Sequence, residues 1–90
     1  VEVVRCDVSR RESVQAFLSG LKLPIGGVFH LAMVLDDAPI GEMSSERITR
    51  VLQPKADGAW NLHEATLDKD LDCFVMFGSV AAILGSPGQA

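Results

Sequence analysis

Hydrophobic residues occur along this chain in two patterns, short continuous runs and longer runs with helical spacing. The continuous runs at 1–6, 28–32 and 73–77 predict three short strands. The second of these runs is almost entirely apolar, which is typical of a strand covered on both faces in a parallel sheet. Helically spaced runs separate the three strands, so we expect an α/β fold with right-handed crossovers in a parallel, doubly wound sheet.

The first helix is expected to begin at a capping box, in which Ser9 caps the helix and Glu12 follows three residues later. Gly20 marks its end. Its predicted buried stripe consists of Val14, Phe17, Leu18 and Leu21.

The second helix is expected to begin at a cap formed by Ser44 or Ser45 and to be kinked by Pro54. Residues 33–43, which separate it from the second strand, contain several helix breakers and predict a loop. The stripe predicted to be buried along this helix is Ile48, Val51, Leu52, Lys55, Ala59 and Leu62.

Composition narrows the class of protein. Ninety residues suffice for one small domain or part of a larger one. A net charge of −4, with scattered basic residues, argues against nucleic acid or an anionic membrane as the main partner. No apolar run approaches the roughly 20 residues of a membrane helix. Cys6 and Cys73 lack the spacing of metal ligands, so we expect two buried free thiols, no metal site and a cytoplasmic location.

Lys55 is a charged residue on the helix face that the apolar pattern predicts to be buried. Three interpretations are open, because such a lysine can reach solvent with its head group, pair with a carboxylate, or point into a functional cleft. Spacing alone favours the first, since a lysine stem covers apolar surface while the ammonium group stays in water.

Ser79 follows the third predicted strand, at the position where open α/β sheets bind their ligands. The alternative is a serine that only forms a turn or caps a helix. No histidine and carboxylate are placed for a hydrolytic triad, so a hydroxyl here is better suited to donate or orient a hydrogen bond than to attack.

Other polar residues have ordinary structural interpretations. Asp7 is suited either to bind a ligand amino group or to begin the turn after the first strand. His30 is interpreted as a core histidine with its hydrogen bonds satisfied. Asp36 and Asp37 are most simply part of a solvated loop.

Taken together, five segments resemble the short-chain dehydrogenase/reductase superfamily, and within it the ketoreductase domain of type I polyketide synthases and animal-type fatty acid synthase. Residues 6–9 resemble the Asp-Val strand end that holds the adenine ring, and residues 28–37 resemble the Asn-Ala-Gly strand end. Residues 55–63 are similar to the family's Lys-x-x-Gly-x-x-x-Leu-His helix. Residues 77–81 and 85–90 resemble its catalytic-serine segment.

The resemblance implies a Rossmann-like sheet and an enzyme that uses NADPH to reduce a β-ketoacyl thioester on an acyl carrier protein. It makes Lys55 and Ser79 the catalytic residues. The residues that it implies at the cofactor are Asp7, Val8, Leu31, Ala32 and Gly78. Met33 departs from the usual glycine and narrows the space beside the cofactor.

A second implication concerns stereochemistry. The Leu-Asp-Asp loop resembles that of B-type polyketide ketoreductases, which deliver a D-configured β-hydroxyl. The residues of this loop are Leu35, Asp36 and Asp37.

The resemblance further implies that residues 1–90 are the central fragment of one ketoreductase domain, truncated at both ends. The family's phosphate loop is expected before Val1 and its proton-donating tyrosine shortly after Ala90. Partners would then be the other domains of a multifunctional synthase. Two alternatives stay open, a non-catalytic ketoreductase-like subdomain and a free-standing short-chain dehydrogenase acting on a small alcohol or ketone.

Overall fold

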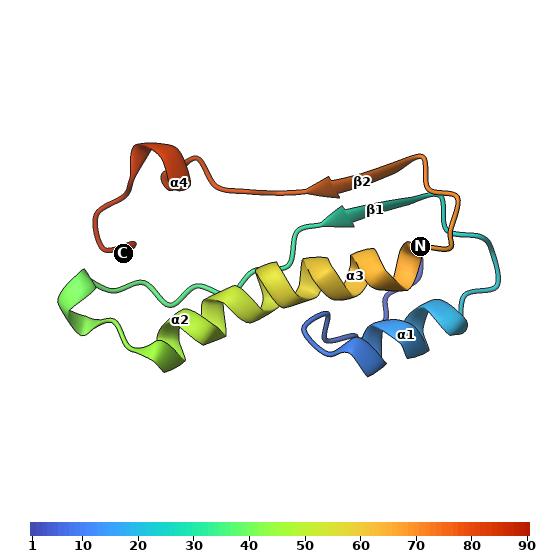
Figure 1. The fold of residues 1–90 in the computed structure, drawn as a ribbon, viewed down its shortest axis with the longest axis horizontal. Helices are drawn as coiled ribbons and strands as arrows, with labels where there is room; N and C mark the ends of the chain where they lie inside the picture. The colour runs from blue at the N-terminus through green and yellow to red at the C-terminus, as the bar shows by residue number, and fades with distance from the viewer.

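Two parallel strands, β1 (Gly27–His30) and β2 (Cys73–Met76), form the single sheet of the computed structural model, which describes residues 1–90 (Figure 1). Gly27 lies opposite Cys73 and His30 opposite Met76. The ladder continues past the strands, because the Phe77 amide donates to the His30 carbonyl at 3.2 Å. The predicted parallel pairing of the second and third strands is therefore confirmed.

The helices α1 and α3 lie on one side of this sheet, and the long helix extends beyond the ends of its strands. The long helix in the middle of Figure 1 runs from α2 into α3, with α1 beside α3 and α4 far from the strands. The helical elements are α1 (Arg11–Ser19), η1 (Ile40–Glu42), α2 (Ser45–Leu52), η2 (Gln53–Asp57), α3 (Gly58–Thr66) and α4 (Ala81–Leu84).

At Pro54, where a kink was predicted, the structure has a wider turn within a continuous helix. Proline has no N–H to donate to the carbonyl four residues before it. The chain therefore widens into the π-helical turn η2, in which the Gly58 amide donates to the Gln53 carbonyl. The start of this helix also matches the prediction, since the Ser44 hydroxyl accepts a bond from the Arg47 amide at 3.3 Å.

Only one face of the sheet is covered, which corrects the expectation of a strand covered on both faces. Val28 and His30 are buried on the face that α3 covers, whereas Phe29, on the opposite face, is 61% exposed. The apolar pattern of β1 suits a strand that is covered on both faces, and within these 90 residues only one face is covered. No helix is both long enough and apolar enough to cross a membrane.

Residues 1–6 do not form the predicted strand. Val1 and Val3 are exposed, and no neighbouring strand offers hydrogen-bonding groups to this segment. A strand needs such a neighbour because its backbone groups bond between chains rather than within one. Cys6 is therefore outside any strand, although both cysteines are free thiols, as predicted, and half-buried.

The predicted capping box is also wrong. The first helix begins at Arg11, and neither Ser9 nor Arg10 caps it through a side chain. Ser9 instead donates both its amide, at 3.0 Å, and its hydroxyl, at 2.7 Å, to Asp7 Oδ1. The Ser9 hydroxyl thus bonds to a carboxylate two residues before it and makes no bond to the first turn of the helix.

The two predicted buried stripes fare differently. Val14 of α1 is fully buried, and Phe17 and Leu18 are half-buried, against α3. Ile48 and Leu52 of α2 are about half exposed, because α2 extends past the end of the sheet and nothing packs on that side. The apolar core is therefore small, and its buried members are Val14, Val28 and Ala38.

Candidate functional site

The candidate residues gather at one edge of the sheet. Because β1 and β2 are parallel, their carboxyl ends lie at the same edge. Leu31 and Ala32 follow β1, and the segment 77–79 follows β2. This is the edge at which α/β sheets hold their ligands.

Lys55 reaches this edge from the π-helical turn. Its Nζ donates a hydrogen bond of 2.8 Å to the carbonyl of Phe77, two residues before Ser79. No carboxylate pairs with it, since none of the salt bridges involves Lys55. Of the three interpretations of this lysine, the pairing with a carboxylate is not observed, and the ammonium group lies at the edge that carries the other candidate residues.

Ser79 has a structural role that does not exclude a chemical one. Its Oγ accepts a bond of 3.2 Å from the Ala81 amide, which starts the short helix α4. A hydroxyl that accepts one bond still has its own O–H to donate. The serine is exposed, so that donor is accessible to a ligand.

His30 holds the backbone of the lysine. It is 4% exposed, and its Nε2 lies 3.2 Å from the carbonyl oxygen of Lys55. A carbonyl can only accept, so the Nε2 atom must carry the proton in this contact. The prediction of a satisfied core histidine is confirmed, and its partner turns out to be the candidate catalytic lysine.

Gly58 and Asn61 bring a distant segment next to this histidine. Gly58 is the glycine of the Lys-x-x-Gly motif, but neither residue was predicted to make this contact. A Cβ at Gly58 would lie 2.9 Å from Val8 Cγ2 and 3.1 Å from His30 Cε1. Asn61, which is buried, donates from Nδ2 to the Val8 carbonyl at 3.0 Å. Their i, i+3 spacing puts them on one helix face, which was the available signal.

Asp7 is an ionised acceptor at the start of this docked segment. The hydrogen bonds from the Ser9 hydroxyl and amide, which favour the charged form, hold the pKa of the Asp7 carboxyl below its ordinary value. Both bonds fall on Oδ1. The Oδ2 atom is therefore left to accept from a ligand.

The loop after β1 differs from the predicted solvated loop at one residue. Asp36 is largely buried by Arg47 and Arg50 of α2, whereas Leu35 and Asp37 are exposed. Asp37 is linked to the end of the chain, since its Oδ2 accepts from Gln89 Nε2 at 3.2 Å.

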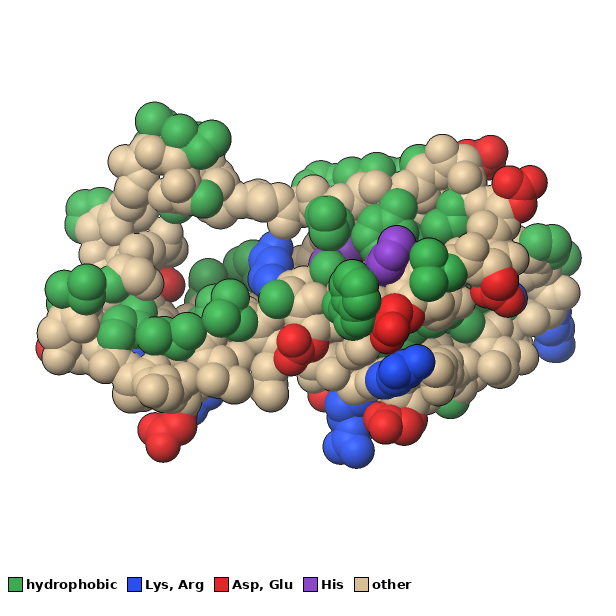
Figure 2. Space-filling view, viewed as in Figure 1, with side chains coloured by type: hydrophobic (Ala, Val, Ile, Leu, Met, Phe, Trp, Pro, Cys, Tyr) green, Lys and Arg blue, Asp and Glu red, His purple; other side chains and the backbone are tan.

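Space for a ligand is present at this edge. Figure 2 shows a hollow between the β2–α4 connection and the long helix, with a basic side chain at its border. Around Gly78 no atom lies within 4 Å of the position of a Cβ. The backbone there is thus open, as predicted for a residue beside a ligand, although nothing within the chain requires glycine.

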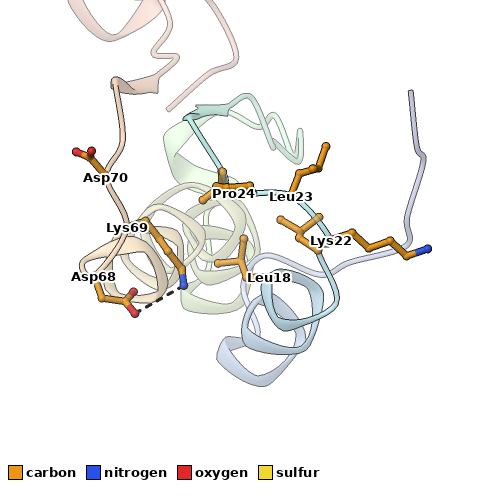
Figure 3. A pocket seen from close by; sticks show the side chains of 9 residues that line it. Leu18, Lys22, Leu23, Pro24, Asp68, Lys69 and Asp70 are labelled. Carbon is orange, nitrogen blue, oxygen red and sulfur yellow. Dashed lines mark ion pairs between the residues drawn. The ribbon is translucent and has the colours of Figure 1, made fainter.

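A cavity at the opposite edge of the sheet contains none of the candidate residues. Its volume is about 460 Å³, and it is bordered by Leu18 and by residues 21–25 and 68–70, segments that precede the two strands (Figure 3). An ion pair of 3.7 Å between Lys69 and Asp68 lies at its rim. The presence of a cavity therefore does not by itself identify the site in this chain.

Comparison with known proteins identifies the family of this chain. The family described as KR domain matches residues 1–90. The chain is 56% identical over 92 residues to the phenolphthiocerol synthesis polyketide synthase type I Pks15/1 of Mycobacterium marinum, and 50% identical over 91 residues to the polyketide synthase GfsB of Streptomyces halstedii. Each match covers 99% of the chain, but only 4% and 2% of the relatives' own length.

Solved structures give the same result. A-type ketoreductases from a modular polyketide synthase are 41% identical, with a TM-score of 0.91 over 99% of this chain and 20% of theirs. An N-terminal ketoreductase from the macrolactin assembly line is 33% identical, with a TM-score of 0.88 over 94% of this chain and 18% of its own. The chain therefore belongs to the KR domain family, the ketoreductases of polyketide synthases, and has their Rossmann-like α/β fold.

Proposed function

We propose that the protein containing this chain reduces the β-keto group of an acyl chain carried on the phosphopantetheine arm of an acyl carrier protein. The observation that carries the proposal is the 2.8 Å bond from Lys55 Nζ to the Phe77 carbonyl. This bond places an ammonium group at the backbone of Phe77, two positions before Ser79 in the sequence. Both residues lie at the edge of the sheet where this fold binds ligands.

The two residues have complementary tasks in such a reaction. The Ser79 O–H donates to the substrate carbonyl and stabilises the negative charge that develops on its oxygen. The Lys55 ammonium lowers the pKa of a neighbouring proton donor by favouring its charged form. These 90 residues contain no tyrosine, so a tyrosine proton donor would come from another part of the protein.

NADPH is the proposed cofactor, and when bound it supplies the hydride. The residues present fit its adenine end, because Asp7 offers a free ionised oxygen and Val8 is fixed beside it by Asn61. The residues proposed to contact the cofactor are Asp7, Val8, Leu31, Ala32 and Gly78.

The proposed setting is a large synthase in the cytoplasm, with its other domains and the carrier protein as partners. The two free thiols agree with a reducing compartment.

The loop of Leu35, Asp36 and Asp37 is proposed to select which face of the substrate carbonyl receives the hydride. We expect the D-configured β-hydroxyl product. Chiral chromatography showing mainly the L alcohol would contradict this assignment.

The proposed function is tested by Lys55→Ala and Ser79→Ala in the intact ketoreductase domain. Each is expected to lower turnover of a β-ketoacyl thioester by about 100-fold or more, with an unchanged circular dichroism spectrum. Lys69→Ala, which alters a lysine at the opposite edge of the sheet, is the matched control. Parental turnover in both site variants would refute the assignment and favour the non-catalytic alternative.

A further inference from the structure

The loop between β1 and η1 is fixed to α2 by one arginine. Arg47 donates to Asp36 Oδ1 from both Nε, at 2.9 Å, and Nη2, at 2.6 Å, and the same Nη2 donates to the Asp37 carbonyl at 3.1 Å. Arg50 adds a single bond of 2.9 Å from Nη1 to Asp36 Oδ2. One guanidinium thus holds both the side chain of the loop and its backbone.

This cluster differs from an ordinary surface ion pair. The side chain of Asp36 is 13% exposed and that of Arg47 is 29% exposed, so solvent and salt screen the pair weakly. The ion pair between Arg11 and Glu64 is the contrasting case, a single 3.6 Å contact whose arginine is 60% exposed. Pairs of the second kind contribute little.

The position of Arg47 on its helix makes it a firm support. Its backbone amide donates to the Ser44 cap, so Arg47 lies in the first, capped turn of α2. The same helix continues through η2 to Lys55. One rigid element therefore sets the positions of both the loop and the candidate catalytic lysine.

Holding Asp36 against α2 leaves the rest of the loop available to a substrate. Leu35 and Asp37 remain exposed on either side of it. The loop follows the carboxyl end of β1, the edge where the substrate is proposed to bind. A displacement of about 1 Å in such a segment is enough to alter a reaction strongly.

We propose that Arg47 is a positioning residue that fixes residues 35–37 and thereby determines which face of the substrate carbonyl is reduced. The inference rests on the proposed function. It assigns the specificity of that reaction to a residue that does not contact the reacting atoms.

The test uses the intact ketoreductase domain with a β-ketoacyl N-acetylcysteamine thioester as the probe. In Arg47→Ala we expect the ratio of the two β-hydroxy isomers to fall roughly tenfold, because the loop loses charge-assisted bonds. KM is expected to rise while kcat stays close to parental, since Lys55 and Ser79 are untouched. Amide hydrogen exchange of residues 33–38 should become faster.

Matched variants separate positioning from a general structural effect. Arg47→Lys keeps the charge without the planar fork and should recover part of the isomer ratio. Arg50→Ala removes one exposed bond and should have a smaller effect. Arg11→Ala removes the surface pair and should change nothing. The double variant Asp36→Ala with Arg47→Ala should exceed Arg47→Ala only by the smaller effect of Arg50→Ala, because Asp36 acts through these two arginines.

Two outcomes would overturn the proposal in distinguishable ways. An active Arg47→Ala variant with the parental isomer ratio would refute the positioning role and leave the proposed function intact. Absence of reduction by the unaltered domain would refute the proposed function, and this inference with it.

Discussion

The half of the molecule formed by α1, α3 and the two strands is held by packing, whereas the half formed by α2, η1, α4 and their loops is held by polar contacts. All but one of the buried residues lie in the first half, the exception being Ala38. The helices α2 and α4 contain no buried residue at all.

In the second half, hydrogen bonds and ion pairs hold the segments in place, whereas apolar packing does so in the first half. Asp36 is held by two arginines, Asp37 by Gln89, and the Phe77 carbonyl by Lys55. Figure 2 shows hydrophobic side chains exposed on α4 and over the strands. The comparison indicates that the candidate chemistry lies where the packed half ends, with few apolar contacts to resist local opening.

The largest expected effect concerns residues 1–90 produced alone. Only seven of the 90 residues are buried, too few to offset the entropy of ordering the chain. We expect no cooperative thermal transition by circular dichroism, self-association by size-exclusion chromatography, and no micromolar NADPH binding by calorimetry, since no glycine-rich phosphate loop is present. The intact ketoreductase domain is the control. A cooperative transition from a monodisperse monomer would show that the packed half is sufficient to fold residues 1–90 alone.

Gly58→Ala in the intact domain tests the packed half. The new Cβ would lie 2.9 Å from Val8 Cγ2 and 3.1 Å from His30 Cε1, and neither group is the end of a long flexible side chain. We expect a loss of roughly 1–3 kcal/mol in the free energy of unfolding, measured by urea denaturation. Gly41→Ala, where a Cβ would meet nothing within 4 Å, is the matched control. Equal stability of both variants would show that this packing is loose.

His30 variants test the contact between the two halves. In His30→Gln the amide nitrogen can take the place of Nε2 and donate to the Lys55 carbonyl, whereas the shorter side chain of His30→Asn cannot reach it. We expect His30→Gln to retain several-fold more kcat than His30→Asn at similar KM. Equal kcat in the two variants would mean that this bond does not position Lys55.

The smallest effect is the pH dependence of Asp7. Its pKa in the folded chain is lowered from 3.8, so the stabilisation is present above that pH and is lost as the pH falls through the lower folded pKa. In the intact domain, Asp7→Asn should therefore reduce the acid sensitivity of the unfolding midpoint slightly below about pH 4. Asp70→Asn, which changes another exposed aspartate, should leave it unaltered. Identical acid profiles for Asp7→Asn and the parental domain would contradict the role of the Ser9 bonds.

Local patterns in the sequence predicted much of the fold. The continuous apolar runs identified β1 and β2, and the strand–helix–strand order predicted their parallel pairing. Ser44 predicted the start of the long helix, and Pro54 marked the place of its wider turn. The helix start and the wider turn follow from local chemistry, because a cap needs a hydrogen-bond acceptor and a regular α-helix needs an N–H at each residue.

Predictions about which segments other elements would cover or pair with failed in several places. The run 1–6 has strand-like composition but no neighbour, and Ile48 and Leu52 have helical spacing but nothing to pack against. The Ser9 hydroxyl bonds to Asp7 and makes no bond to the first turn of the helix. The sequence of a segment shows that it is suited to pair as a strand or to pack as a helix. Whether another element lies in place to pair or pack with it depends on the tertiary structure.

The candidate site divides in the same way. The sequence by itself determined the family resemblance and singled out Lys55 and Ser79. The tertiary structure decided that the Lys55 ammonium points to the strand end, that His30 holds its carbonyl, and that Arg47 binds the loop of Asp36. These contacts join residues 11 to 25 positions apart, and no local pattern encodes them because they exist only when the chain brings separate elements together.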